Sequence, residues 1–100
     1  MSVFYLLFKD DCLAYHLGQR FSTRDQDNDA WQDVSCAAVK AKGAWWYRHC
    51  HDSNLNGLYY DSGNYTSDYD DGVVWGFWKG WWYSLRFTEM KLRPFDVRIE

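Results

Sequence analysis

Three carboxylates at alternate positions form the most conspicuous group of residues in this chain that could bind a ligand. Asp25, Asp27 and Asp29 lie in the stretch RFSTRDQDNDAW, with one residue between each pair. Side chains two apart in an extended segment point to the same side, so this spacing brings carboxylate oxygens together. Calcium binds such oxygens. A solvated acidic turn without a metal is the alternative, because Asp and Asn favour turns in any case.

A second stretch, RHCHDSNLNG, places His49 and His51 on either side of Cys50. Taken alone, His51 is better explained as a core histidine than as a ligand-binding group. The sequence has Ser, His and Asp residues, but no nucleophile elbow, HExxH motif or paired-acid motif. The chain is therefore predicted to bind a ligand, not to act as an enzyme.

The composition restricts the class of protein. One hundred residues make at most one domain with a modest core, and an aromatic content of 21% with a net charge of −3 indicates a folded chain. Lys and Arg are spread along the chain, so the basic stripe of a nucleic-acid binder is missing. No apolar run is long enough to cross a bilayer, and neither membrane insertion nor nucleic acid is expected.

Three cysteines, Cys12, Cys36 and Cys50, leave one over if two of them pair. A disulfide between Cys36 and Cys50 would close a short loop; for about 15 residues such a bond is worth roughly 3 kcal/mol. It would indicate an oxidising compartment, and the Asn64-Tyr65-Thr66 glycosylation pattern is consistent with secretion. Three reduced, buried thiols are the alternative. The remaining cysteine, Cys12, could join two copies of the chain into a homo-oligomer. The alternative is that Cys12 is buried and unreactive.

Short elements must position these residues. We expect, in chain order, a buried strand at 3–8, a turn at Gly18 leading into an extended segment, one short helix within 31–43 that stops at Gly43, a long loop over 57–72, and one or two strands within 73–94. Most of the tryptophans are expected in the core because aromatic side chains carry large burial energies; these are Trp45, Trp46, Trp75, Trp78 and Trp82.

Three motifs in succession carry a family resemblance. FSTRDQDNDAW, CAAVKAKGAWWYRHCHDSNLNGLYY and DGVVWGFWKGWWYSLRFTEMKLRP, from Leu13 to Pro94, resemble the C-terminal half of a fibrinogen-related domain. Ficolins, tachylectins, tenascins and angiopoietins belong to this family. The resemblance implies an α+β fold: a truncated fibrinogen C-terminal-like domain, loop-rich, with short antiparallel strands and one or two short helices. Residues 1–100 would form a single partial domain that lacks the amino-terminal half.

The same resemblance implies a calcium site in the acidic stretch. Asp27 and Asp29 would supply carboxylate oxygens, and backbone carbonyls at Trp31 and Asp33 would complete the shell, a mixture that calcium accepts. The interval between Asp29 and the next cysteine is one residue longer than is usual in the family. The alternative carbonyls are therefore those of Gln32 and Val34.

The resemblance also implies the Cys36–Cys50 disulfide and a ligand pocket. In the family the peptide bond before the second cysteine is often cis, which here is the bond between His49 and Cys50. The acetyl-binding lectins of the family have apolar pocket walls at the positions of Tyr69 and Trp81. The pocket of this chain would also include His51, Asp70, where those lectins commonly carry Ala, and Ala41, where they carry an aromatic wall. His49 and Cys50 would contribute through the cis bond between them, which aims backbone N–H groups into the pocket.

Two functions follow from these positions. Trp81 and His51 favour a secreted, calcium-dependent module of innate immunity that binds acetylated sugars, such as the N-acetylglucosamine-type glycans of microbial cell walls. Asp70 and Ala41 favour the alternative, a protein or peptide interaction module such as a receptor ligand or a fibrin-like assembly unit. An acidic group at Asp70 resembles the fibrinogen pocket that accepts a positively charged peptide amino terminus.

Overall fold

Short elements separated by long loops make up the described part of the chain. The computed structural model describes residues 11–91, so the strand expected at 3–8 lies outside the described residues. The elements are a 3-10 helix η2 (Ala14–His16), a π-helix η3 (Cys36–Ala41), strands β1 (Ser53–Asn54) and β2 (Val74–Trp75), and the helix α1 (Gly76–Lys79). This loop-rich arrangement confirms the expected fold class.

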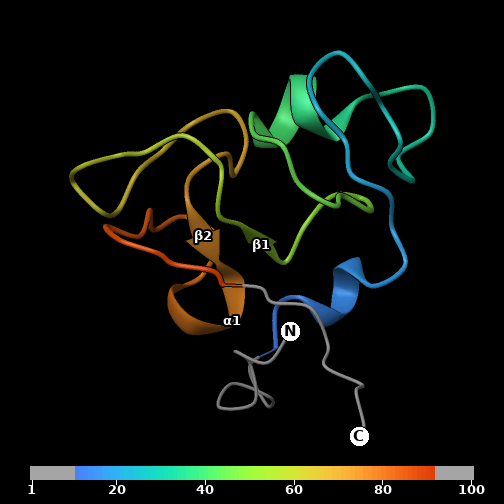
Figure 1. Cartoon of the computed structure of the whole chain (residues 1–100). Coiled ribbons are helices and arrows are strands. Elements are labelled where there is room, and N and C mark those ends of the chain that lie inside the picture. Colours follow the sequence, from blue (N-terminus) through green and yellow to red (C-terminus); the bar gives the residue numbers. More distant parts are fainter. Residues whose placement is uncertain (1–10, 92–100) are drawn as a thin grey trace, which may run out of the picture.

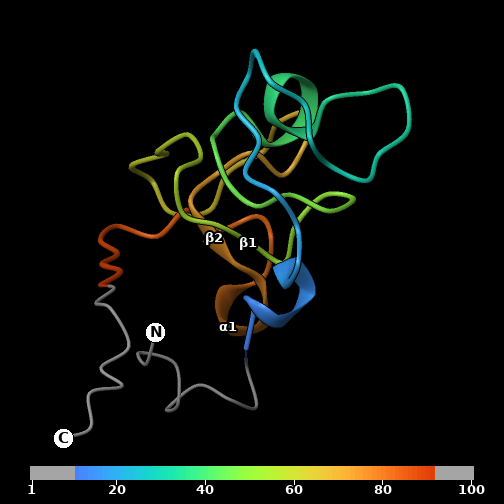
Figure 2. The same ribbon diagram turned by 45° about the vertical axis from the view of Figure 1, so that its right-hand side comes forward.

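The two strands lie in the middle of the molecule, between η3 on one side and the helices α1 and η2 on the other. They pair antiparallel, with Ser53 opposite Trp75 and Asn54 opposite Val74, and all four residues are buried. In Figure 1 the green helix η3 and the loop before it lie above the strands, whereas α1 and the blue helix η2 lie below them. The turned view in Figure 2 keeps this order. The buried ladder therefore connects the disulfide region with the helix α1.

The helix expected within 31–43 forms, but it is shorter and ends differently. The Ser35 side chain caps η3 by accepting the Ala38 N–H at 3.1 Å. The left-handed residue after the helix is Lys42, with φ 63°, and not Gly43. A Cβ on Gly43 would lie 2.5 Å from the carbonyl oxygen of Asn56. Gly43 is therefore required by a close backbone approach, and the prediction that it stops the helix is wrong.

The segment after the long loop also differs from the expected strands. After β2 the chain turns into α1, which begins at Gly76. Glycine is required at this position because a Cβ would clash with the Trp81 ring. Residues 84–91 form no strand within the described part of the chain. Leu85 N–H donates to the Val73 carbonyl at 2.7 Å, but an alternating pattern becomes a strand only along a paired neighbour.

Buried polar groups, as well as apolar packing, hold the core together. Around the disulfide, Ala37, Trp45 and Tyr47 are almost fully buried. The buried Asn54 amide donates to the carbonyl oxygens of Ala41 and Gly72, at 2.9 and 3.1 Å, and its own oxygen accepts the Tyr47 hydroxyl. One amide thus ties three segments to β1, with its polar atoms satisfied.

The tryptophans divide between core and surface. Trp45 and Trp75 are buried as expected, with 2% and 7% of their surface exposed. Trp78 and Trp82 are 65% and 45% exposed, so the prediction that they belong to the core is wrong for these two. Trp78 lies on α1, where Lys79 places its ammonium over the ring at 5.2 Å. No helix within residues 11–91 is long and apolar enough to span a membrane.

Candidate functional site

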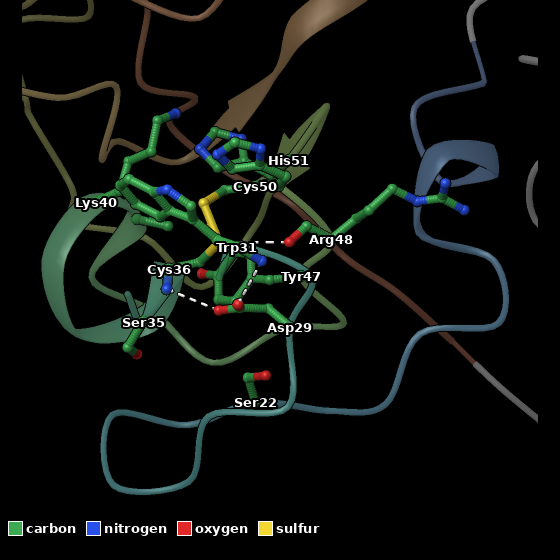
Figure 3. Close-up of a disulfide and its surroundings, with 12 residues drawn as sticks. Ser22, Asp29, Trp31, Ser35, Cys36, Lys40, Tyr47, Arg48, Cys50 and His51 are labelled. Carbon is green, nitrogen blue, oxygen red and sulfur yellow. Dashed lines mark hydrogen bonds between the residues drawn. A yellow bond between two sulfur atoms is a disulfide. The ribbon is translucent and has the colours of Figure 1, made fainter. Parts of the chain in front are cut away.

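A disulfide between Cys36 and Cys50 joins η3 to the turn that leads into β1 (Figure 3). The Cα atoms lie 5.7 Å apart, and both cysteines are buried. The predicted pairing is confirmed. Cys12 is fully buried, and its sulfur accepts the Phe77 N–H at 3.3 Å, which favours the buried alternative over an intermolecular bond.

The two histidines beside the second cysteine lie in different surroundings. The peptide bond between His49 and Cys50 is cis, as the resemblance implies. The exposed His49 ring contacts the Trp31 ring at 5.1 Å, and the Tyr15 hydroxyl donates to the His49 carbonyl at 2.9 Å. The His51 side chain is fully buried. His49 therefore lies beside the acidic loop, and only His51 lies at the expected pocket.

The acidic stretch is attached to the disulfide through one carboxylate. Asp29 accepts the Cys36 N–H at 2.7 Å with one oxygen and the Trp31 N–H at 2.9 Å with the other (Figure 3). Asp27 accepts the Asp29 N–H at 3.1 Å. Asp25 accepts the Thr23 hydroxyl at 2.7 Å. Asp29 thus fixes the loop relative to the start of η3.

The donor chemistry of this loop fits calcium. Burial raises the pKa of Asp29, and the neighbouring Asp27 carboxyl raises it further. A divalent cation relieves this kind of repulsion between carboxylates. Within residues 11–91 no three His, Cys, Asp or Glu side chains are grouped for a metal, so the remaining oxygens would be carbonyls or waters. At the expected carbonyl positions, Trp31 accepts the Val34 N–H at 3.3 Å, and Asp33 has a left-handed backbone with φ 64°.

We expect the two aspartates to differ in their effect on stability when calcium is absent. Asp29→Asn replaces one of the two accepting oxygens by an NH₂ group, which then faces the N–H of Trp31 or of Cys36. One backbone donor is left without an acceptor, so the variant should lose about 2 kcal/mol of unfolding free energy. Asp27→Asn keeps an acceptor for the Asp29 N–H and should stay within about 0.5 kcal/mol of the wild type. Urea unfolding in chelator measures both values. Equal losses would contradict the assigned role of Asp29.

Two of the predicted pocket residues, Asp70 and Trp81, contact a third, the buried His51. Its Nε2 lies 3.1 Å from the Asp70 carbonyl oxygen, and the Trp81 indole N–H donates to the His51 carbonyl at 3.2 Å. Burial lowers the pKa of His51 to about 4, with Asp70 opposing this shift and Lys40 adding to it. The ring is therefore neutral at pH 7. Its Nδ1 is buried and has no partner among the described residues.

Asp70 is paired with a lysine that the sequence did not indicate. The Lys40 ammonium lies 2.6 Å from an Asp70 carboxylate oxygen, and both side chains are partly exposed, at 24% and 15%. The next pair, Lys42 and the buried Asp71, is 3.4 Å apart. Two lysines at the end of η3 thus face two consecutive aspartates. Lys40 and Asp70 are 30 residues apart, so no local spacing could reveal the contact.

The other predicted pocket residues take different positions. Tyr69 is 36% exposed and lies next to Asp70 in the chain. Ala41 is fully buried, and its carbonyl accepts the Asn54 amide, so this side chain does not line an open surface. Cys50 is 3% exposed and contributes through the disulfide. His51, Asp70 and Trp81 therefore form the candidate site, with Tyr69 at its edge and Lys40 as an addition.

A second concave surface lies outside the predicted residues. It has a volume of about 420 Å³ and is lined by Phe21, Trp45, Trp46, Leu55, Asn56, Thr88 and Met90. Of this lining, Trp45 and Trp46 were assigned to the core from the sequence, because spacing alone does not tell which face of a tryptophan is covered.

Comparison with known proteins agrees with this architecture. The family model of the C-terminal globular domain of fibrinogen beta and gamma chains matches residues 5–95. The chain belongs to this family. Domains of this family are typically ligand-binding modules.

Particular relatives show how much of a longer protein this chain matches. Fibrinogen-like protein 1 of Mesocricetus auratus is 52% identical over 83% of the chain, and the match covers 26% of that protein. Fibrinogen C domain-containing protein 1 of Macaca fascicularis is 56% identical over 84% of the chain and 19% of its own length. The chain thus spans about a quarter or less of these relatives.

Solved structures give the same result. The fibrinogen-like globe domain of human ANGPTL2 superposes with a TM-score of 0.73 and 45% identity, over 76% of this chain and 34% of that one. The lamprey fibrin D-dimer, in complex with the peptide Gly-His-Arg-Pro-amide, has a TM-score of 0.64 and 35% identity, over 85% of this chain and 31% of its own.

Proposed function

We propose that this chain is an extracellular recognition module that binds a protein or peptide ligand through a cationic group at Asp70. One observation carries the proposal: Asp70 already holds a primary ammonium, that of Lys40, at 2.6 Å. The lamprey fibrin relative is in complex with a peptide whose amino terminus is a primary amine. The disulfide supports an oxidising, extracellular location.

Binding would proceed by exchange of one ammonium for another. The Lys40 side chain is long and 24% exposed, so its ammonium can turn from Asp70 into solvent, where water replaces the carboxylate as its partner. A ligand amino group would then donate to the same carboxylate. The neutral His51 adds no competing positive charge, and Tyr69 offers an aromatic edge for an apolar group of the ligand. This is binding without a chemical step.

Calcium at Asp27 and Asp29, with the carbonyls at Trp31 and Asp33, is part of the proposal. The support is the connection from Asp29 to the Cys36 N–H at the first residue of η3, the helix that carries Lys40. An ion held by this loop would stabilise the folded state by mass action and hold η3 in place. Added calcium should raise the melting temperature of the wild type and leave that of Asp27→Asn unchanged. Equal responses of the two proteins would remove calcium from the account.

Acetylated carbohydrate is a second candidate ligand, favoured by one specific feature. The neutral His51 ring has a buried Nδ1 without a partner among the described residues, and the N–H of an acetamido group would donate to such an acceptor. Trp81 and Tyr69 would contact the methyl group and the sugar ring. This reading corresponds to the innate-immune lectin that the sequence resemblance implies.

Two substitutions test the peptide proposal because their effects have opposite signs. Asp70→Asn removes the charged acceptor and should weaken binding of a short peptide with a free amino terminus about tenfold. Lys40→Ala removes the internal competitor and should strengthen it about threefold. Fluorescence or calorimetric titration of the purified protein measures both affinities.

Lys42→Ala is the matched control, since Lys42 is on the same helix end but pairs with Asp71. It should leave the affinity for the peptide unchanged. A Lys40→Ala variant that binds more weakly than the wild type would show that Lys40 assists binding, and the proposed exchange would then be wrong.

A further inference from the structure

We propose that Asn64 is a glycosylation site that carries an N-linked oligosaccharide. Asn64-Tyr65-Thr66 is the single Asn-x-Ser/Thr triplet in the sequence, and its middle residue is not proline. The proposal goes beyond ligand binding but rests on the extracellular location proposed above, because the transfer takes place in the secretory pathway.

The side chains of Asn64, the glycan acceptor, and of Thr66, the hydroxyl residue of the triplet, both lie on the solvent side. Asn64 and Thr66 are exposed, whereas Tyr65 between them is buried at 8% exposure. The Tyr65 hydroxyl donates to the Trp81 carbonyl at 2.7 Å and accepts the Gly72 N–H at 2.8 Å. Side chains alternate along an extended segment, so anchoring Tyr65 inward points Asn64 and Thr66 to the same, solvent side.

The backbone around Asn64 is held while its side chain is available. Asn64 lies opposite Tyr83 in an isolated antiparallel bridge, flanked by the hydrogen bonds Tyr65 N–H to Trp82 O at 3.1 Å and Ser84 N–H to Gly63 O at 2.8 Å. Its carbonyl accepts the Ser62 hydroxyl at 2.8 Å. Within residues 11–91 the Asn64 side-chain amide makes no hydrogen bond. A glycan can thus be attached there without breaking a contact of the fold.

The proposed transfer forms one bond and breaks one. The Asn64 amide nitrogen bonds to the anomeric carbon of an oligosaccharide carried on a polyprenyl pyrophosphate, and the bond from that carbon to the pyrophosphate oxygen breaks. The lipid pyrophosphate leaves with the bonding electrons, and the amide nitrogen gives up one proton to the medium. No group is oxidised or reduced. The product is a bulky, solubilising surface group.

The test is expression of the full chain in a eukaryotic secretory host, behind a cleavable signal sequence. An added C-terminal Asn-Gly-Thr acceptor reports entry into the lumen, independently of Asn64 and of any ligand. We expect two glycan increments on a gel, both removed by a peptide N-glycosidase. Asn64→Gln and Thr66→Ala should each show one increment, and Thr66→Ser should show two.

A single increment on the wild-type chain would overturn the proposal, because the added acceptor then proves that the chain entered the lumen and Asn64 was passed over. The same result in Thr66→Ser as in Thr66→Ala would also contradict it, since the hydroxyl of the third residue is what the triplet supplies. Peptide titration of the glycosylated protein tests the proposed ligand site separately, so failure of one proposal is distinguishable from failure of the other.

Discussion

Replacing Cys36 and Cys50 by alanine should lower the free energy of unfolding by about 3 kcal/mol, the value for a disulfide that closes a loop of about 15 residues. The two cysteines are 14 residues apart and both are buried in the main apolar cluster. A domain of this size has a small core, so such a loss is a large part of its total stability. Urea unfolding of the wild type and of the double variant measures the difference.

A reducing agent provides the matched control. It should destabilise the wild type by a similar amount and leave the double alanine variant unchanged, because Cys12 is buried and is not part of the bond. A variant as stable as the oxidised wild type would contradict the view that this link holds η3 to the strand region.

Acidification from pH 6.5 to pH 4 should lower the free energy of unfolding by about 3 kcal/mol through His51 alone. In the folded protein burial holds the pKa of His51 at about 4, against 6.5 in the unfolded chain. Between these values the unfolded state binds one more proton, so stability rises with pH and is lost as pH falls through this window. Each pH unit corresponds to about 1.4 kcal/mol. Urea unfolding at a series of pH values measures the decline.

A second histidine should add to this acid sensitivity. The His16 ring lies 2.8 Å from the Trp46 carbonyl through Nδ1, and its Nε2 accepts the N–H groups of Asp52 and Ser53 at 3.1 and 3.3 Å. This arrangement requires the neutral ring with its proton on Nδ1, and burial lowers the pKa of His16. Protonation would turn Nε2 into a donor that faces two other donors.

The variants separate these contributions. His51→Gln should remove the larger part of the decline between pH 6.5 and pH 4, whereas His49→Gln should retain it, because the His49 ring is exposed and takes no part in the buried network. A decline that is the same in His51→Gln as in the wild type would show that the acid sensitivity arises elsewhere.

The parts of the structure that the sequence predicted are those fixed by local chemistry. The short helix after Ser35 and the disulfide between Cys36 and Cys50 both involve residues that are near one another in the chain. The strand that was expected toward the end of the chain is absent from residues 84–91. The alternation of apolar and polar residues there shows only that a strand could form. Whether a strand forms depends on a paired neighbour, and within the described residues no backbone hydrogen bond joins the segment to a neighbour beyond Leu85.

The candidate site shows a similar division. His51, Asp70 and Trp81 were placed by family resemblance, and the structure brings them together. Lys40 was missed because an ion pair between distant residues leaves no pattern in a single sequence. Ala41 was predicted to open the pocket, because it is a small residue where the family has an aromatic wall. Such a residue leaves open space only if neighbouring atoms do not fill it. In this structure the neighbouring atoms bury Ala41 completely.

The most direct test of the peptide-binding proposal is calorimetric titration with a short amidated peptide that has a free amino terminus, compared with the same peptide after N-acetylation and with N-acetylglucosamine. Each ligand is titrated into the oxidised protein with calcium and with chelator. Exchange at Asp70 predicts saturable heat from the free peptide and none from its acetylated form. Equal heats from the two peptides, or heat from N-acetylglucosamine alone, would contradict a cation-binding role for Asp70.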